Sequence, residues 1–217
     1  MSTAIHDSVP WPTVARGLAV ATVVYNLAEG AVATAFGWSE GSVALFGFGV
    51  DSFVEVGSAA LVLWSLGRSG DCGRTSLERE RRATRGISAL LVVLAAGVAL
   101  SSLARLGAHE APDSSVPTLV VSAVSLAFMG FLWRAKRAAA VAMDSRTLAM
   151  DAACSLACIQ LSVVLLAGSL ASLVSPAWWW ADGVAALGLA VLIGREGRNG
   201  WRAAARPDFD GGCGCGH

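Results

Sequence analysis

The amino-acid sequence predicts an all-α, polytopic membrane protein with six transmembrane helices. Its 217 residues are 55% hydrophobic and 15% charged, with a mean hydropathy of +0.60. Soluble domains average about 45–50% apolar and about 25% charged residues. The apolar residues also fall into six blocks, each near the ~20 residues that a helix needs to cross a bilayer. The blocks are approximately Val14–Phe36, Ser42–Leu66, Gly86–Leu106, Val116–Trp133, Leu148–Val174 and Ala177–Gly194.

The first block is interpreted as a retained helix. A cleavable signal peptide is the competing interpretation, because Ala31–Ala33 resembles a cleavage site. A signal peptide has a basic start and an uninterrupted apolar stretch. Here the start carries one arginine and one aspartate, and the apolar run contains Asn26 and Glu29. These features favour a transmembrane span.

The connections between the blocks predict antiparallel neighbours. Gly67–Arg85 is the only long connection, and its Ser76–Arg85 portion is predicted to form a short charged helix leading into the third span. Short loops force successive helices to run antiparallel in a bundle. The predicted outer loops are all short, namely Gly37–Gly41, Gly107–Ser115 and Ser175–Pro176.

Positive charges set the predicted orientation. All of the 16 Lys and Arg residues except Arg105 lie on one side of the six-helix arrangement. The positive-inside rule makes that side the cytoplasm. We therefore expect a cell-membrane protein with both termini cytoplasmic: a segment 1–13, a transmembrane domain 14–196 and a tail 197–217. These basic residues are interpreted as topology signals, and no nucleic-acid partner is expected. They are Arg16 at the start of the first span, Arg68, Arg74, Arg79, Arg81, Arg82 and Arg85 in the second-to-third loop, Arg134, Lys136, Arg137 and Arg146 in the fourth-to-fifth loop, and Arg195, Arg198, Arg202 and Arg206 after the sixth block.

Two acids in the second span are the strongest functional signal. Asp51 and Glu55 are four residues apart, so both carboxylates share one helix face. A charged side chain at the centre of a bilayer costs at least about 2.5–3.5 kcal/mol, so such acids usually face a partner, an ion or a water-filled cavity. The alternative is that both acids bond to Ser or Thr hydroxyls as structural glue. Two acids on one face are hard to satisfy in that way.

Two cysteines in the fifth span match the acids. Cys154 and Cys158 have the same spacing, and counting about 1.5 Å per residue from the outer helix ends places both pairs at overlapping depths. Two carboxylates and two thiols would form a four-ligand site for a divalent metal. The alternative is packing, because buried Cys behaves as a small hydrophobe. The five cysteines are not expected to form disulfides.

Other polar residues have weaker interpretations. Asn26 and Glu29 lie level with Asp51, where Glu29 would be a neighbour of the ligands, an entry ligand, a proton carrier or an interhelical hydrogen-bond partner. Asp151 lies nearer the cytoplasm and would line the entry path. Asp182 begins the sixth span, where an acid near a helix N-terminus is favourable in itself.

The end of the tail carries three metal-binding side chains, Cys213, Cys215 and His217. They suit transient capture of a soft metal, although a plain glycine-rich end is the alternative and three such donors are too few to close a structural zinc site. No nucleophile–base constellation, phosphate loop or dinucleotide motif is present, so neither an enzyme nor a permanently bound cofactor is expected.

Three segments resemble the cation diffusion facilitator family. Residues 41–55 resemble its second helix, which carries an Asp-x-x-x-Asp zinc-binding pair, and residues 145–158 resemble its fifth, where His-x-x-x-Asp is common. Residues 179–187 are similar to the start of its sixth helix. This chain looks closest to a small branch that lacks the family's cytoplasmic domain and histidine-rich loop.

The resemblance implies a six-helix bundle, a homodimer and transport by alternating access. Because carboxyl and thiol ligands lose protons to bind metal, the predicted function is efflux of Zn²⁺ in exchange for protons. Cd²⁺, Co²⁺ and Fe²⁺ are the next candidates, since two thiols in place of His and Asp favour softer ions. A metal-binding membrane protein that does not transport, such as a sensor or partner subunit, is the alternative.

Overall fold

The computed structural model describes residues 10–40, 43–67, 74–109 and 116–209. Within these ranges the secondary structure is helical, which confirms the predicted all-α class. A 3₁₀ turn, η2 (Pro176–Trp178), separates the last two long helices. The long helices are α1 (Trp11–Glu40), α2 (Val43–Leu66), α3 (Arg74–Ala108), α4 (Val116–Ala142), α5 (Arg146–Val174) and α6 (Ala181–Ala205).

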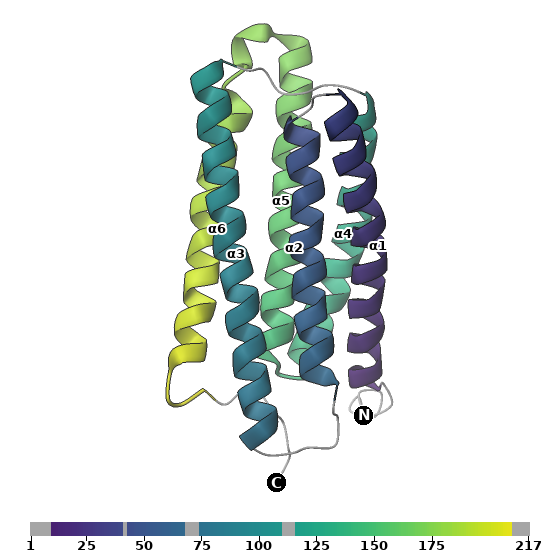
Figure 1. Ribbon diagram of the computed structural model, residues 1–217, viewed down its shortest axis with the longest axis vertical. Coiled ribbons are helices and arrows are strands. Elements are labelled where there is room, and N and C mark those ends of the chain that lie inside the picture. The colour runs from purple at the N-terminus through teal and green to yellow at the C-terminus, as the bar shows by residue number, and fades with distance from the viewer. Residues whose placement is uncertain (1–9, 41–42, 68–73, 110–115, 210–217) are drawn as a thin grey trace, which may run out of the picture.

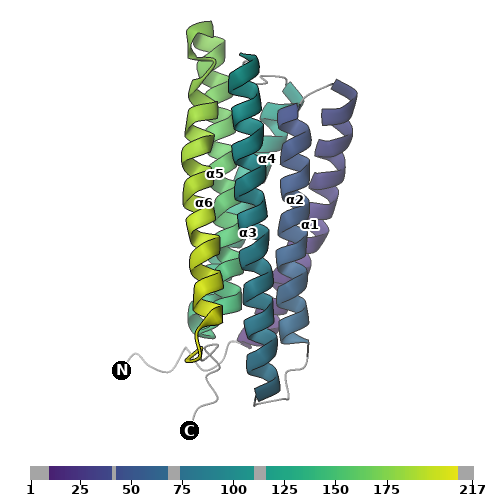
Figure 2. The same ribbon diagram turned by 60° about the vertical axis from the view of Figure 1, so that its left-hand side comes forward.

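The helices stand side by side as one elongated bundle (Figures 1 and 2). The most extensive packing pairs α1 with α2, α3 with α6 and α4 with α5. Helices α2 and α5 also touch each other, and α1 contacts α4. This arrangement places the predicted acid-bearing and cysteine-bearing helices against each other inside the bundle.

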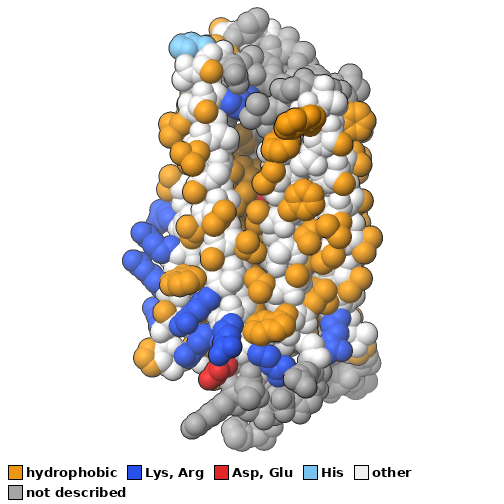
Figure 3. Space-filling model, viewed as in Figure 1, with side chains coloured by type: hydrophobic (Ala, Val, Ile, Leu, Met, Phe, Trp, Pro, Cys, Tyr) orange, Lys and Arg blue, Asp and Glu red, His pale blue; other side chains and the backbone are white. Residues whose placement is uncertain are grey.

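Five of the described helices, α1 to α5, are long and apolar enough to cross a membrane. Helix α6 carries Arg195, Glu196 and Arg198 in its second half and lies along α3 (Figure 1). Large apolar side chains such as Val24, Leu100 and Phe131 lie on the outer surface, which Figure 3 shows widely covered by hydrophobic groups. In a bilayer this exposure is favourable, since lipid tails are themselves apolar. The chain is therefore a multi-pass membrane protein.

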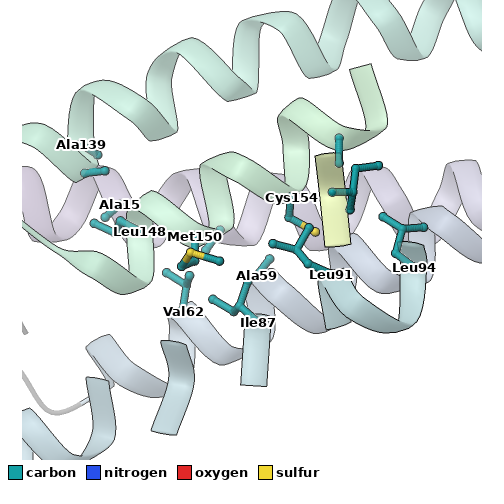
Figure 4. Packing of buried hydrophobic residues seen from close by; sticks show 14 of the residues in the cluster. Ala15, Ala59, Val62, Ile87, Leu91, Leu94, Ala139, Leu148, Met150 and Cys154 are labelled. Atoms are coloured by element: carbon teal, nitrogen blue, oxygen red, sulfur yellow. The ribbon is translucent and has the colours of Figure 1, made fainter. Parts of the chain in front are cut away.

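A hydrophobic cluster fills the bundle between α2, α3 and α5 (Figure 4). Ala59 and Val62 of α2 meet Ile87 and Leu91 of α3, and Cys154 of α5 points into the same cluster. All five side chains are fully buried.

Several helices extend beyond the predicted spans. Helix α1 continues to Glu40, so most of the predicted loop Gly37–Gly41 is helical. Helix α3 is continuous from Arg74, so the predicted charged helix Ser76–Arg85 is its first part. Helix α6 continues to Ala205, into the predicted tail.

The position of Lys136 corrects a prediction. The sequence placed it in a cytoplasmic fourth-to-fifth loop, but α4 continues to Ala142 and the Lys136 side chain is only 1% exposed. The connection between α4 and α5 consists of residues 143–145 only. Ser145 caps the start of α5 by accepting a hydrogen bond from the backbone N–H of Leu148. A count of positive charges at helix ends therefore misassigned one of them.

Most of the other described basic residues gather toward one end of the bundle, where α1 begins and α6 ends (Figure 3). Two of them bind the end of α6. Arg81 donates a hydrogen bond to the backbone oxygen of Arg206, and Arg85 donates one to that of Ala204. These arginines satisfy carbonyl groups that the last turn of a helix leaves without partners.

Candidate metal centre

Helix α2 directs both predicted acids into the bundle. Asp51 is 6% exposed and Glu55 is fully buried. Their spacing of one helical turn puts them on the face that meets α5. Asp51 Oδ1 and Glu55 Oε1 are buried without a hydrogen-bond partner among the described residues. Orphaned buried oxygens are costly, so each acid retains an acceptor that is suited to a cation.

Helix α5 buries both predicted cysteines as free thiols. The Cys158 thiol lies beside the Asp51 carboxylate, within range of a polar interaction. Cys154 lies within electrostatic range of Asp51 and Glu55. Both cysteines also belong to hydrophobic clusters, Cys154 with Ala59 and Leu91 (Figure 4) and Cys158 with Met129 and Leu132. Burial alone is therefore consistent with the packing interpretation for both, and the proximity to Asp51 distinguishes Cys158.

The four predicted ligands lie in one region, but their donor atoms do not already surround a single point. Among the described residues, no three Asp, Glu, Cys or His side chains are close enough together to hold one ion. Binding through all four side chains would need rotamer changes. The ligand assignment of Asp51, Glu55, Cys154 and Cys158 therefore stays a prediction.

A buried lysine joins this region. Lys136 Nζ lies 3.3 Å from Glu55 Oε2 and 3.0 Å from Asp151 Oδ2. It also donates a hydrogen bond to Ser155 Oγ, at 2.9 Å. Ser58 Oγ donates to the other Asp151 oxygen, Oδ1, at 2.6 Å. Asp151, which was expected to line an entry path, is thus enclosed in a buried ion-pair network and only 1% exposed.

Sequence reasoning missed Lys136, although a signal was present. The buried residues in the second half of α4 are Met129, Leu132, Lys136, Ala139 and Ala140. Their spacings of three and four define one face of the helix, and Lys136 lies on it. The flanking Arg134 and Arg137 are exposed. Helical periodicity, rather than proximity to other charges, identifies Lys136 as an inward-facing residue.

Helix α1 contributes a separate polar cluster beside Asp51. Glu29 accepts hydrogen bonds from Tyr25 Oη at 2.9 Å and from Ser52 Oγ at 3.1 Å. Because Ser52 follows Asp51 in α2, Glu29 lies at the level that residue counting predicted. Asn26 is fully buried, and its amide donates to the backbone oxygen of Thr22 at 3.0 Å. Glu29 thus links α1 to α2 by a hydrogen bond, which is the interhelical alternative among its predicted roles.

The remaining predicted site residues cannot be placed in the same detail. Asp182 lies in the first turn of α6, but its side chain is outside the described part of the structure. Cys213, Cys215 and His217 also lie outside the described residues.

These features define a class of protein: a helical, multi-pass membrane protein with buried acids and thiols between its helices. Residues 19–205 match the model of the cation efflux transmembrane domain. The chain therefore belongs to the cation efflux family, whose members transport metal cations and are not enzymes. No curated protein gives a significant match to it. The matched region includes all of α2 to α6 and most of α1.

Proposed function

We propose that this metal cation transporter exports Zn²⁺ from the cytoplasm in exchange for protons, through a site formed by Asp51, Glu55, Cys154 and Cys158. The observation that carries the proposal is the buried contact between α2 and α5, where Asp51 meets the Cys158 thiol and each acid retains an unpartnered oxygen. Carboxylate oxygen and thiolate sulfur are both ligands of Zn²⁺.

The same groups supply the coupling to protons. Thiols and carboxylic acids bind a divalent metal after losing their protons, so metal and protons compete for one set of atoms. A site that alternates between the two membrane faces then exchanges metal for protons. Glu29 lies beside Asp51 and accepts two hydrogen bonds, and we assign it a role in conducting protons to the site.

The orientation and assembly belong to the same proposal. With both termini in the cytoplasm, the basic end of the bundle faces the compartment from which metal is taken up. The family resemblance favours a homodimer, and the outer apolar surface of the helices provides lipid and subunit contacts.

The proposal is tested by metal flux into liposomes with an imposed pH gradient. An acidic lumen should drive uptake of Zn²⁺ into vesicles, and collapsing the gradient with an ionophore should stop it. Asp51→Asn keeps the shape of the side chain but removes its charge, so it should abolish this flux while the protein still inserts and folds. Glu78→Gln is the matched control, because Glu78 is exposed in the first part of α3 and forms an ion pair with its neighbour Arg82, away from the buried acids.

Three results would contradict parts of this proposal. Flux that Asp51→Asn leaves unchanged would place the pathway elsewhere, with Glu29 as the next candidate. Flux that is independent of the pH gradient would remove proton exchange. Zinc binding without flux, by folded protein in correctly oriented vesicles, would favour a sensor or partner subunit. Parallel assays with Cd²⁺, Co²⁺, Fe²⁺ and Mn²⁺ establish which metal is preferred.

A further inference from the structure

The Lys136 side chain is the most unusual feature of the bundle that metal binding leaves unexplained. Its ammonium group has three N–H donors. The structure provides three acceptors, one each from Glu55, Asp151 and Ser155. A lysine that is 1% exposed and fully paired is held in a fixed place. It lies on α4, whereas its partners belong to α2 and α5, so it ties three helices together.

The two acids that Lys136 contacts are not equivalent. Asp151 has both oxygens satisfied, one by Lys136 and one by Ser58. Glu55 has only Oε2 engaged, by Lys136 and by Ser155 at 3.3 Å, while Oε1 has no partner among the described residues. Both Asp151 oxygens thus have partners in the network. Glu55 is held through Oε2, and its Oε1 is available to bind a cation.

The balance of formal charge gives this arrangement a meaning. When ionised, the buried carboxylates of Asp51, Glu55 and Asp151 outnumber the Lys136 ammonium by two negative charges, and each thiol that loses its proton adds to this excess. In a low-dielectric interior such an excess favours a divalent cation over a monovalent one. The ammonium and an entering metal ion are therefore attracted by the same negative charge.

Stability alone is a weak reason for such a network. Replacing a buried ion pair by well-packed apolar side chains is often neutral or stabilising, because desolvation of the charges offsets their attraction. The network also borders the predicted ligands directly, since Glu55 belongs to both. Its position therefore indicates a role in the cation site rather than only in the fold.

We propose that Lys136 is a tethered competitor for the metal, a positioning residue that holds Glu55 until a divalent cation displaces it, and that Asp151 retains the displaced ammonium. This inference rests on the proposed metal site and adds a determinant of its affinity. Asp151 is then a charge partner of Lys136 and not a metal ligand.

The test compares three charge variants of the full-length protein in detergent. Lys136→Gln removes the competitor, Asp151→Asn leaves the ammonium free to hold Glu55 more tightly, and the double variant restores the original charge balance. We measure Zn²⁺ and Cd²⁺ affinity by calorimetry, and thermal unfolding without metal by tryptophan fluorescence. Arg137→Gln, at an exposed neighbouring position on α4, is the matched control.

The expected order of affinity is specific to this proposal. Lys136→Gln should bind Zn²⁺ at least about tenfold more tightly, because a nearby positive charge is removed, and Asp151→Asn should bind it more weakly. The double variant should return to near the original affinity, and Lys136→Gln should melt at a lower temperature without metal. Zn²⁺ should recover most of that loss.

The opposite results overturn the proposal. If Lys136→Gln melts at a lower temperature but binds Zn²⁺ with unchanged affinity, Lys136 has a structural role only. Weaker binding in Lys136→Gln would make the ammonium a support for the site. If Lys136→Gln does not fold, the double variant decides. A Zn²⁺ affinity as weak in the double variant as in Asp151→Asn would show that Asp151 is itself a ligand. Failure of the whole site is recognised separately, because Asp51→Asn would then retain Zn²⁺ binding.

Discussion

Asp51 and Glu55 lie one turn apart on α2, yet they have different neighbours. Asp51 faces the Cys158 thiol, and Glu55 faces the Lys136 ammonium and the Ser155 hydroxyl. A thiol is a metal ligand once it loses its proton, whereas an ammonium is a cation that opposes metal binding. Asp51 is therefore adjacent to a second donor, and Glu55 is adjacent to the proposed competitor.

The two cysteines should contribute unequally to metal affinity. Cys158→Ala removes the thiol beside Asp51, whereas Cys154→Ala removes one that interacts with the acids only through longer-range electrostatics. We expect the larger loss of Zn²⁺ affinity from Cys158→Ala, and a loss of more than about 100-fold from the double variant, since even residues that only support a ligand change affinity by about 10–100-fold. Calorimetry with Ser162→Ala as the control measures this. Unchanged affinity in the double variant would leave only the acids as ligands.

Metal preference should follow the same two positions. Replacing Cys154 by His and Cys158 by Asp removes both sulfur donors, and soft ions lose more from that change than harder ions do. The double variant should therefore keep Zn²⁺ transport while Cd²⁺ transport weakens. The ratio of the two fluxes in liposomes measures the preference, and an unchanged ratio would mean that the thiols do not contact the transported ion.

Helices α1 and α2 pack closely because glycines face each other at their contact. A Cβ atom on Gly49 would lie 2.7 Å from the backbone nitrogen of Thr34 and 3.0 Å from the backbone oxygen of Gly30. Backbone atoms cannot move aside as a side chain can, so any larger residue must separate the helices. This contact holds Asp51 and Ser52 near Glu29, and it therefore links helix packing to the candidate site.

Gly49→Ala should destabilise the bundle. Overpacking a close contact costs typically about 1–3 kcal/mol, and the shift of α2 should also reduce metal flux. Gly47→Ala is a matched control two residues away, because a Cβ there meets no heavy atom within 4 Å and alanine favours the helix by about 1 kcal/mol. Melting temperatures in detergent compare the two. An equal response of both variants would mean that the α1–α2 contact is not the limiting one.

Most of the described basic residues lie toward one end of the molecule, which we call the basic end (Figure 3). Helix α1 begins and α6 ends at the basic end, so the described ends of the chain lie on the same side of the bundle (Figures 1 and 2). If that end is cytoplasmic, protons and metal enter the site from opposite faces in the way that efflux requires.

Reporter fusions should establish this orientation. Green fluorescent protein at the C-terminus should fluoresce in a bacterial host, and alkaline phosphatase at the same point should be inactive, because both report a cytoplasmic location. Fusions after His109, at the end of α3, should give the reverse pattern. Active phosphatase at the C-terminus would invert the orientation, and the proposed direction of transport would change with it.

The sequence alone was sufficient to predict the helical class, the approximate spans and the inward position of Asp51, Glu55, Cys154 and Cys158. These are local properties, because a run of apolar residues specifies a membrane helix and spacing by four specifies a shared face. The ligand assignment itself remains a prediction, since neither spacing nor burial specifies where donor atoms meet.

Only the tertiary structure decided which groups Lys136 contacts. In the sequence it stands between Arg134 and Arg137, and its sign suggested one more topology signal. The packing of α4 against α5, and of α5 against α2, brings it to within 3.3 Å of Glu55, which lies 81 residues away in the chain. A charge is recognised from the sequence, but its partner is selected by contacts between helices that the local pattern does not encode.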